Sequence, residues 1–406
     1  MTLRQSEELL VSSQRVAGQG ESRHSIWAAS LTGACAAGIV FGWLFLCVHY
    51  LYGGNWTSVY YTGEKWKTPA QLEHEHIYRF AGTSGYDGEQ YHVVAHDPFG
   101  RTDMWKTVDM PRFRYRRILV PGLAALFSFG HDSWVDPAYI GVFLCFVYLG
   151  SFWLARWAQV HGFTAAWGLL FLLVPATLAC VLFMVVDVVT AALTVGLAWY
   201  AERKYDKRLY LLLAAAALSR ETGIILALGY CLWLLVQRQI KRMVVFGTSM
   251  LPALLWFLWV QKRFPPGGFE YVSSPIPFIG IYRGFLYHVV YQQKILLYLD
   301  YLGIAAMAAA IGIALYFSFR RKYWNEVTFV GLGFAVLAAL ISHELVWNEV
   351  NAFGRHFAPL LVVVGLTAAM DRKWWLLAPM FLIDLRILAV YANHAGRIMA
   401  AVLHRG

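Results

Sequence analysis

The chain has 406 residues, of which 59% are hydrophobic and only 14% are charged, and its formal net charge is +10. An ordinary soluble domain carries about 25% charged residues, so this chain lacks the polar side chains that would cover a soluble core. Its apolar residues stand in long continuous runs, unlike the alternating segments of about ten residues that a membrane barrel needs. The composition excludes a soluble enzyme, a disordered protein, a fibre and a barrel. It predicts an all-α, polytopic helical membrane protein.

The excess of basic residues fits membrane topology. Lys and Arg stand mostly in short clusters between apolar runs, as the positive-inside rule requires, at 203–208, 238–242, 320–322 and 372–373. We therefore expect membrane lipids as a partner and no nucleic acid. The cysteines all lie within apolar runs and none forms a CxxC pair, which indicates small core residues and not disulfides or metal ligands.

The apolar runs divide the chain into seven parts. We expect a cytoplasmic tail at 1–25, a first transmembrane helix at 26–51, an external loop at 52–137, transmembrane helices at 138–262, a second external loop at 263–295, transmembrane helices at 296–394 and a tail at 395–406. The apolar run at 118–129 is too short to cross a membrane, since crossing takes about 20 residues. It predicts an interfacial or re-entrant helix in the large first loop. If this run does not cross the membrane, all basic clusters and the N-terminus lie on the cytoplasmic side, and the chain has about eleven spans.

The densest motif lies in the first external loop, where Gly85-Tyr86-Asp87-Gly88 precedes a helical pattern that Asp97-Pro98 ends. The glycines predict a turn that leaves Asp87 exposed as the N-cap of a short helix. Tyr91 and His92 follow at helical spacing. An alternative is a purely structural role, in which the helix is a capped loop helix and Asp97 closes an Asx turn.

These residues resemble the membrane glycosyltransferases of the GT-C class. The likeness is nearest to bacterial proteins of cell-surface glycopolymer formation and more distant to GPI mannosyltransferases. The segments that carry it are Gly85-Tyr86-Asp87-Gly88 with Tyr91, Asp97-Pro98-Phe99, residues 114–121, Val174-Pro175-Ala176 with Asp187, Ser219-Arg220-Glu221-Thr222-Gly223, and Arg355-His356 with Pro359-Leu360. The resemblance implies a GT-C-like fold whose first external loop carries a catalytic acid. The paired acids of the class are absent here, and Asp87 with Glu89 is the closest pair.

The resemblance also implies a chemistry for which these residue types are suited. Sugar transfer from a polyprenyl-phosphate donor needs a carboxylate that accepts the acceptor's proton, and Asp87 is the candidate base. Glu89 is a second candidate acid, and Asp97 would orient the acceptor or help hold a divalent ion. Mg²⁺ or Mn²⁺ would suit such a carboxylate site, although the sequence requires no metal.

The remaining candidates would bind substrate. Cations near the departing phosphate would stabilise its charge, and four arginines stand at predicted membrane edges: Arg116, Arg117, Arg220 and Arg355. Snorkelling to lipid headgroups is the alternative for each of them. Asp187 lies inside an apolar run. It would either line the site or form a hydrogen bond between packed helices. The other candidates are Tyr86, Tyr91, His92, Glu221 and His356.

The sequence thus predicts a glycosyltransferase of the bacterial inner membrane that acts on its external face. It would move a sugar from a polyprenyl-phosphate donor to a cell-surface glycan or lipid acceptor. Two alternatives remain: a transporter or flippase of lipid-linked sugars, and a non-catalytic membrane component of a polysaccharide-assembly system. The short sequence His74-Glu75-His76 has no third ligand nearby along the chain, so we expect it to be a solvated loop and not a metal site.

Overall fold

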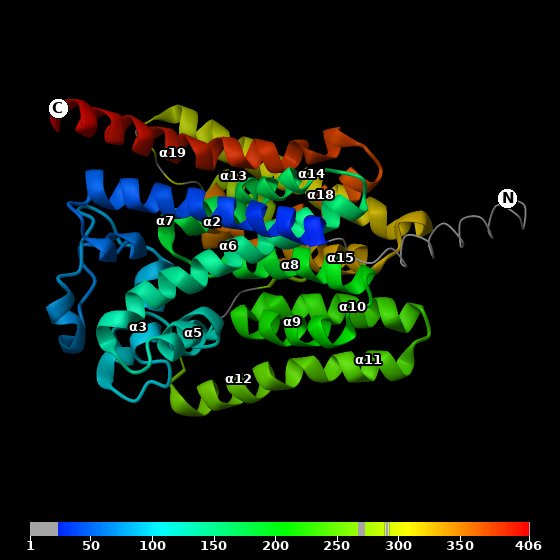
Figure 1. Cartoon of the computed structure of the whole chain (residues 1–406), viewed down its shortest axis with the longest axis horizontal. Helices are drawn as coiled ribbons and strands as arrows, with labels where there is room; N and C mark the ends of the chain where they lie inside the picture. Colours follow the sequence, from blue (N-terminus) through cyan, green and yellow to red (C-terminus); the bar gives the residue numbers. More distant parts are fainter. Residues whose placement is uncertain (1–22, 267–272, 288, 290, 292, 406) are drawn as a thin grey trace, which may run out of the picture.

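The computed structural model describes residues 23–266, 273–287, 289, 291 and 293–405. Within these ranges the chain is helical and forms no β-strand, apart from two isolated β-bridges, Gly63 to Phe80 and Ser273 to Ile341. Most helices run along the long axis of the molecule, and the segment between α2 and α6 gathers at one end (Figure 1). The prediction of an all-α fold is confirmed.

Several helices are long and apolar enough to cross a membrane. In the part of the chain that the structure describes there are five: α2 (Arg23–Leu51), Asp132–Val160 with α6 (Val135–Val160), Ile240–Arg263 with α11 (Ile240–Gly247) and α12 (Leu251–Arg263), α14 (Lys294–Phe319), and Trp374–His404 with most of α19 (Ala378–Arg405). Two bent helix pairs raise the number to seven if each pair is one span: η5 (Ala165–Leu173) with α7 (Pro175–Phe183), and α17 (Val350–His356) with α18 (Ala358–Met370). The chain is a multi-pass helical membrane protein.

The prediction of eleven spans is wrong in number. Several apolar runs form half-length helices: α8 (Asp187–Glu202), α9 (Asp206–Ser219), α10 (Ile224–Val236) and α15 (Glu326–Leu340). A helix of 14 residues such as α9 is only about 21 Å long, which is shorter than the hydrocarbon core. The predicted stretch of transmembrane helices at 138–262 is also interrupted at Met184, which ends α7 with a φ of 46°. Helix α8 is apolar because protein surrounds it: every residue from Asp187 to Trp199 is buried.

The predicted first loop at 52–137 contains only short helices. They are η1 (Trp56–Tyr60), η2 (Ala70–Glu75), α3 (Asp87–His96), η3 (Asp103–Thr107), α4 (Pro111–Arg114), α5 (Leu119–Phe127) and η4 (Asp132–Trp134). Helix α5 coincides with the short helix expected at 118–129. The second predicted loop contains α13 (Ile279–Leu286), and α16 (Glu344–Trp347) precedes α17. Most of the predicted tail at 1–25 lies outside the described residues, and the predicted tail at 395–406 continues α19 as far as Arg405.

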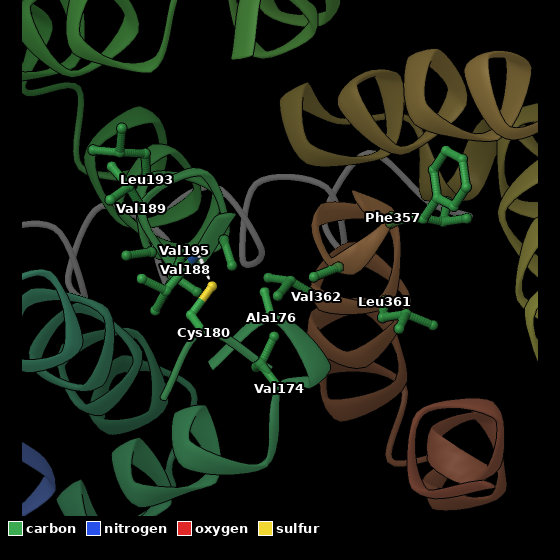
Figure 2. Close-up of a cluster of buried hydrophobic side chains, with 14 of the residues drawn as sticks. Val174, Ala176, Cys180, Val188, Val189, Leu193, Val195, Phe357, Leu361 and Val362 are labelled. Carbon is green, nitrogen blue, oxygen red and sulfur yellow. Dashed lines mark hydrogen bonds between the residues drawn. The ribbon is translucent and has the colours of Figure 1, made fainter. Parts of the chain in front are cut away.

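A hydrophobic core joins the central helices. Figure 2 shows Val174, Ala176 and Cys180 of the α7 region facing valines of α8 and Val362 of α18. The backbone N–H of Val188 also donates to Cys180 Sγ at 3.2 Å, which ties the start of α8 to α7. This core fixes Asp187, the first residue of α8, beside the segment that carries Arg355.

Candidate functional site

A cavity of about 370 Å³ lies between the start of α3, the segment 110–117 and helices α16 and α17. Its wall contains five of the residues predicted from the sequence: Tyr86, Asp87, Arg117, Arg355 and His356. Arg114 and Glu349 also line it, although the sequence predicts neither of them as a site residue. The cavity therefore joins the first-loop motif to the late Arg355-His356 motif, which are far apart in the chain.

The glycine-rich turn positions Asp87 at the start of α3. Gly85 has a φ of +81°, a conformation that favours glycine, and Tyr86 is extended as the N-cap. Asp87 is therefore the first helical residue and not the N-cap that the sequence predicts. Its negative charge is favourable there because the N-terminus of a helix carries a partial positive charge. The side chain is free to leave the helix end and meet other partners.

Asp87 lies between two arginines. Its Oδ1 is 2.9 Å from an Nη atom of Arg114, and its Oδ2 accepts a hydrogen bond of 2.6 Å from Arg355. Burial alone would raise the pKa of the Asp87 carboxyl, but the guanidinium groups of Arg114 and Arg355 outweigh burial and hold that pKa well below its usual range. The carboxylate is therefore ionised, and its side chain keeps about 21% of its surface exposed.

The two arginines continue into a larger network of alternating charges. Arg114 donates two hydrogen bonds to Asp109, at 2.8 and 2.7 Å. Arg355 donates to Asp187 at 2.9 Å, and Asp187 also pairs with Arg220. The order of the network is Asp109, Arg114, Asp87, Arg355, Asp187, Arg220, Glu221 and Arg117. Buried charges are costly unless they are paired in this way.

The predicted residues Asp187, Arg220 and Glu221 support the cavity from behind, since none of them lines it. Arg117 donates to Glu221 at 2.9 and 2.5 Å and to the Tyr91 hydroxyl at 2.7 Å. Tyr91 is fully buried, so it positions Arg117 and does not line the cavity. Because the acids stand behind their arginines, the cavity wall presents three guanidinium groups, from Arg114, Arg117 and Arg355, against two carboxyls.

The second of those carboxyls belongs to Glu349. Burial raises its pKa, although Arg355 opposes the effect. The Tyr86 hydroxyl donates to Glu349 Oε1 at 3.2 Å, and the Arg355 guanidinium lies 4.9 Å from the centre of the Tyr86 ring. Tyr86 therefore holds one face of Arg355. His356 lies beside it, and its Nδ1 is 2.6 Å from the carbonyl oxygen of Ala352.

Three further predicted site residues, Glu89, Asp97 and Arg116, also lie outside the cavity wall. Glu89 is buried, and its Oε2 accepts a hydrogen bond of 2.9 Å from the Gly63 N–H. Asp97 accepts from the N–H groups of Arg101 and Thr102 at 2.7 and 2.8 Å, and so it closes the loop after α3. This is the structural role that the sequence left open for Asp97. Arg116 is directed toward the ring of Phe257, 5.8 Å away.

His92 belongs to a different cluster. It lies in the second half of α3 with His96, and both face Glu75 and Asp136. Burial would lower the pKa of His92, but Asp136 and Glu75 outweigh burial and raise it to about 10. The sequence predicted Glu75 to lie in a solvated loop because its partners are remote in the chain; the structure brings His92, His96 and Asp136 to it. The spacing of His92 and His96, one helical turn apart, was the available signal.

Arg114 was missed although its segment was recognised. Arg114 is the last residue of α4, Arg117 follows it by three residues, and both line the cavity, while Arg116 does not. Spacing of three or four residues places side chains on one face of a helix. That periodicity would have favoured Arg114 over Arg116. Glu349 offers no comparable local signal.

No protein-family model, curated protein or solved structure matches the chain.

Proposed function

We propose that the protein is a membrane glycosyltransferase that moves a sugar from a polyprenyl-phosphate donor to a cell-surface glycan or lipid. Asp87 is the base in this proposal. The observation that carries it is the cavity in which one ionised carboxylate stands among three guanidinium groups, from Arg114, Arg117 and Arg355. A phosphate needs cationic hydrogen-bond donors of this kind, and arginine binds it through two parallel hydrogen bonds.

The proposed reaction uses the two kinds of group together. The acceptor hydroxyl loses its proton to an Asp87 oxygen as its own oxygen forms a bond to the anomeric carbon of the sugar. The bond between that carbon and the phosphate oxygen breaks, and the phosphate leaves with the electron pair. Arg114 and Arg355 then stabilise the charge that develops on the departing phosphate. No metal is needed in this sequence of steps.

Without substrate, the low pKa of Asp87 makes it a weak base, because two arginines hold its carboxylate. This is consistent with the proposed role if donor binding raises that pKa. A bound donor phosphate would compete for the same guanidinium groups and add negative charge nearby, and both effects raise the pKa of Asp87. The donor would thus activate the base at the moment when the reaction requires it. Charged residues behind the wall, such as Asp187, would keep Arg355 in place while its partner changes.

The proposal extends to topology and location. In the bacterial inner membrane, with the N-terminus in the cytoplasm, the first loop and its cavity would lie on the external face. The basic clusters at 203–208, 238–242 and 320–322 support this orientation. Each of them joins apolar segments, and short loops rich in Lys and Arg favour the cytoplasmic side. The donor would enter from the bilayer and the acceptor from outside.

The test is sugar transfer by the purified full chain in lipid nanodiscs. A panel of synthetic short-chain polyprenyl-phosphate hexoses and pentoses serves as donors, and a delipidated cell-envelope extract supplies acceptors. Release of polyprenyl phosphate and labelling of the acceptor are measured by mass spectrometry. Asp87→Asn keeps the size of the side chain but removes the base, so transfer should fall by about 10²- to 10⁴-fold.

Asp103→Asn is the matched control. Asp103 lies in the same loop, its side chain is 76% exposed, and it pairs at the surface with Lys106. This variant should transfer sugar at the wild-type rate. If Asp87→Asn is present at normal amounts, unfolds at the wild-type temperature and still transfers at the wild-type rate, Asp87 is not the base. If wild-type protein releases no polyprenyl phosphate from any donor of the panel, the transferase proposal fails.

A further inference from the structure

Four side chains from three segments meet at the far end of α3. Glu75 ends η2, His92 and His96 lie on α3, and Asp136 is in the first turn of α6. His92 Nε2 is 3.1 Å from Glu75 Oε2 and 3.0 Å from Asp136 Oδ1. His96 Nε2 is 3.2 Å from Glu75 Oε1 and 3.7 Å from the same Asp136 oxygen. One atom of each side chain thus points at a common centre.

These close approaches are not explained by hydrogen bonds. The two histidine side chains are only 1% exposed, and Glu75 and Asp136 are 11% and 19% exposed. The Nε2 atoms of His92 and His96 and the Oε2 of Glu75 are nevertheless buried without a hydrogen-bond partner of acceptable geometry. Buried polar atoms normally have one. The contacts to Glu75 and Asp136 are ion-pair approaches, but the two Nε2 atoms and Glu75 Oε2 converge with no satisfied hydrogen bond of their own, which indicates a ligand at their centre.

The separations match those around a metal ion. Zn²⁺ binds histidine nitrogen and carboxylate oxygen at about 2.0–2.1 Å, so ligand atoms at tetrahedral corners lie about 3.3 Å apart. The four contacts between a histidine nitrogen and a carboxylate oxygen span 3.0 to 3.7 Å, and one ligand atom from each of the four side chains lies within 4.8 Å of the others. His92 and His96 are four residues apart on one helix, a spacing that directs both rings to one side.

Outer residues hold these ligands in the orientation a metal requires. The Nδ1 of His96 lies 2.6 Å from Asp132 Oδ1, which leaves its Nε2 free to face the centre. The Tyr60 hydroxyl donates to Asp136 at 2.7 Å, and the Tyr60 ring stacks on the His92 ring with 4.2 Å between the two ring centres. Metal-binding histidines commonly have a carboxylate on the second ring nitrogen.

We propose that Glu75, His92, His96 and Asp136 bind a structural Zn²⁺ ion. Two imidazoles with two carboxylates suit Zn²⁺ better than Mg²⁺ or Ca²⁺, which prefer oxygen ligands alone. Four protein ligands close the site, as in structural zinc centres. None of the four lines the cavity, so the ion is not part of the transfer chemistry. Its effect is to fasten η2 and α3 to the start of α6.

The experiment measures metal directly and does not depend on the transferase proposal. The full chain is purified in detergent with a tag that binds no metal, and its metal content is measured by inductively coupled plasma mass spectrometry. About one Zn²⁺ per chain is expected. Removal by a chelator should lower the unfolding temperature, and added Zn²⁺ should restore it. His92→Asn combined with His96→Asn should lose the ion, whereas the exposed control His131→Asn should retain it.

A second variant covers the case in which the double variant does not fold. Glu75→Gln keeps both histidines and should weaken Zn²⁺ binding by at least about tenfold. The proposal is overturned if wild-type protein contains less than about a tenth of an equivalent and takes up no Zn²⁺, since the cluster is then a protonated histidine held by carboxylates. Full occupancy by Mn²⁺ or Fe²⁺ in place of Zn²⁺ would overturn the choice of ion. Unchanged Zn²⁺ content in Glu75→Gln and in the folded double variant would overturn the choice of ligands.

Discussion

The two ends of helix α3 carry clusters of opposite character. At its first residue, Asp87 lies between the guanidinium groups of Arg114 and Arg355. In its second half, His92 and His96 face the carboxylates of Glu75 and Asp136. One helix therefore places a carboxylate among cations and imidazoles among anions. The first arrangement is suited to an anionic ligand and the second to a cationic one.

This difference teaches that neighbouring charges in one loop need not form one site. His92 and His96 follow Asp87 by five and nine residues, which corresponds to about 8–14 Å along the helix. Effects of changes at sites this far apart usually add. Substitutions at the arginine end should thus leave the metal content unchanged, and substitutions at the histidine end should not directly alter phosphate binding.

The largest effect is expected for Arg355→Gln. Arg355 is the shared partner of Asp87 and Asp187, and Asp187 is only 1% exposed. Removing one member of a buried ion pair costs about 3–5 kcal/mol of folding free energy because a buried charge stays without its partner. Unfolding in detergent, monitored by intrinsic fluorescence, should shift to a lower temperature. Added polyprenyl phosphate, which should stabilise the wild type, should lose most of its effect.

The exposed Arg283→Gln is the matched control for this change and should behave as wild type. Combining Arg355→Gln with Asp187→Asn should recover part of the lost stability, since the unpaired charge is removed. An Arg355→Gln variant as stable as wild type would show that the network does not stabilise the fold. A lost metal ion in this variant would show that the two ends of α3 are coupled.

Gly88→Ala should have the next largest effect, at both ends of the helix. A Cβ at Gly88 would overlap the backbone oxygen of Phe183 and lie 2.7 Å from that of Tyr60. Helix α3 would have to move away from α7 and η1, and such overpacking costs about 1–3 kcal/mol. The expected result is a lower unfolding temperature together with weaker phosphate binding and weaker metal binding. Thermal unfolding with and without each ligand measures all three.

Gly141→Ala offers a control with open space around the added methyl group. Gly141 lies in α6, and nothing is within 4 Å of a Cβ at that position. Alanine is the better helix former, so this variant should be at least as stable as wild type. If Gly88→Ala weakens one ligand and spares the other, α3 does not act as one rigid element.

Local parts of the site were predictable from the sequence. The turn at Gly85, the helix after it and its end before Pro98 all depend on residues within about a dozen positions, and the structure contains each of them. The helical membrane class follows from composition alone. The number of spans did not follow, because apolar runs such as α8 are buried among other helices and hydropathy does not separate this from burial in lipid.

The partners of these local elements were not predictable in the same way. Asp87 and Arg355 are separated by 268 positions, and Glu75 meets Asp136 only because both residues contact the histidines of α3. A single sequence holds no record of such pairings. The resemblance brought Asp87 and Arg355 into one hypothesis, and the structure places them 2.6 Å apart. For the histidine cluster the sequence offered only the helical spacing of His92 and His96.

Glu89→Gln should have the smallest effect and tests a carboxyl that belongs to neither cluster. Burial raises the pKa of Glu89 from 4.5 to about 7, although hydrogen bonds from Gly63 and Gln90 oppose the shift. Between pH 4.5 and 7 the folded protein therefore binds the Glu89 proton more tightly than the unfolded chain.

The contribution of protonated Glu89 to the free energy of unfolding is complete below pH 4.5 and is lost as the pH rises toward 7. Wild-type protein should thus unfold at a lower temperature at pH 8 than at pH 5, and glutamine, which does not titrate, should flatten this dependence. The exposed Glu73→Gln should retain the wild-type dependence of unfolding temperature on pH. If Glu89→Gln shows the same dependence as wild type, Glu89 is not its source, and the pH dependence belongs to the two clusters at the ends of α3.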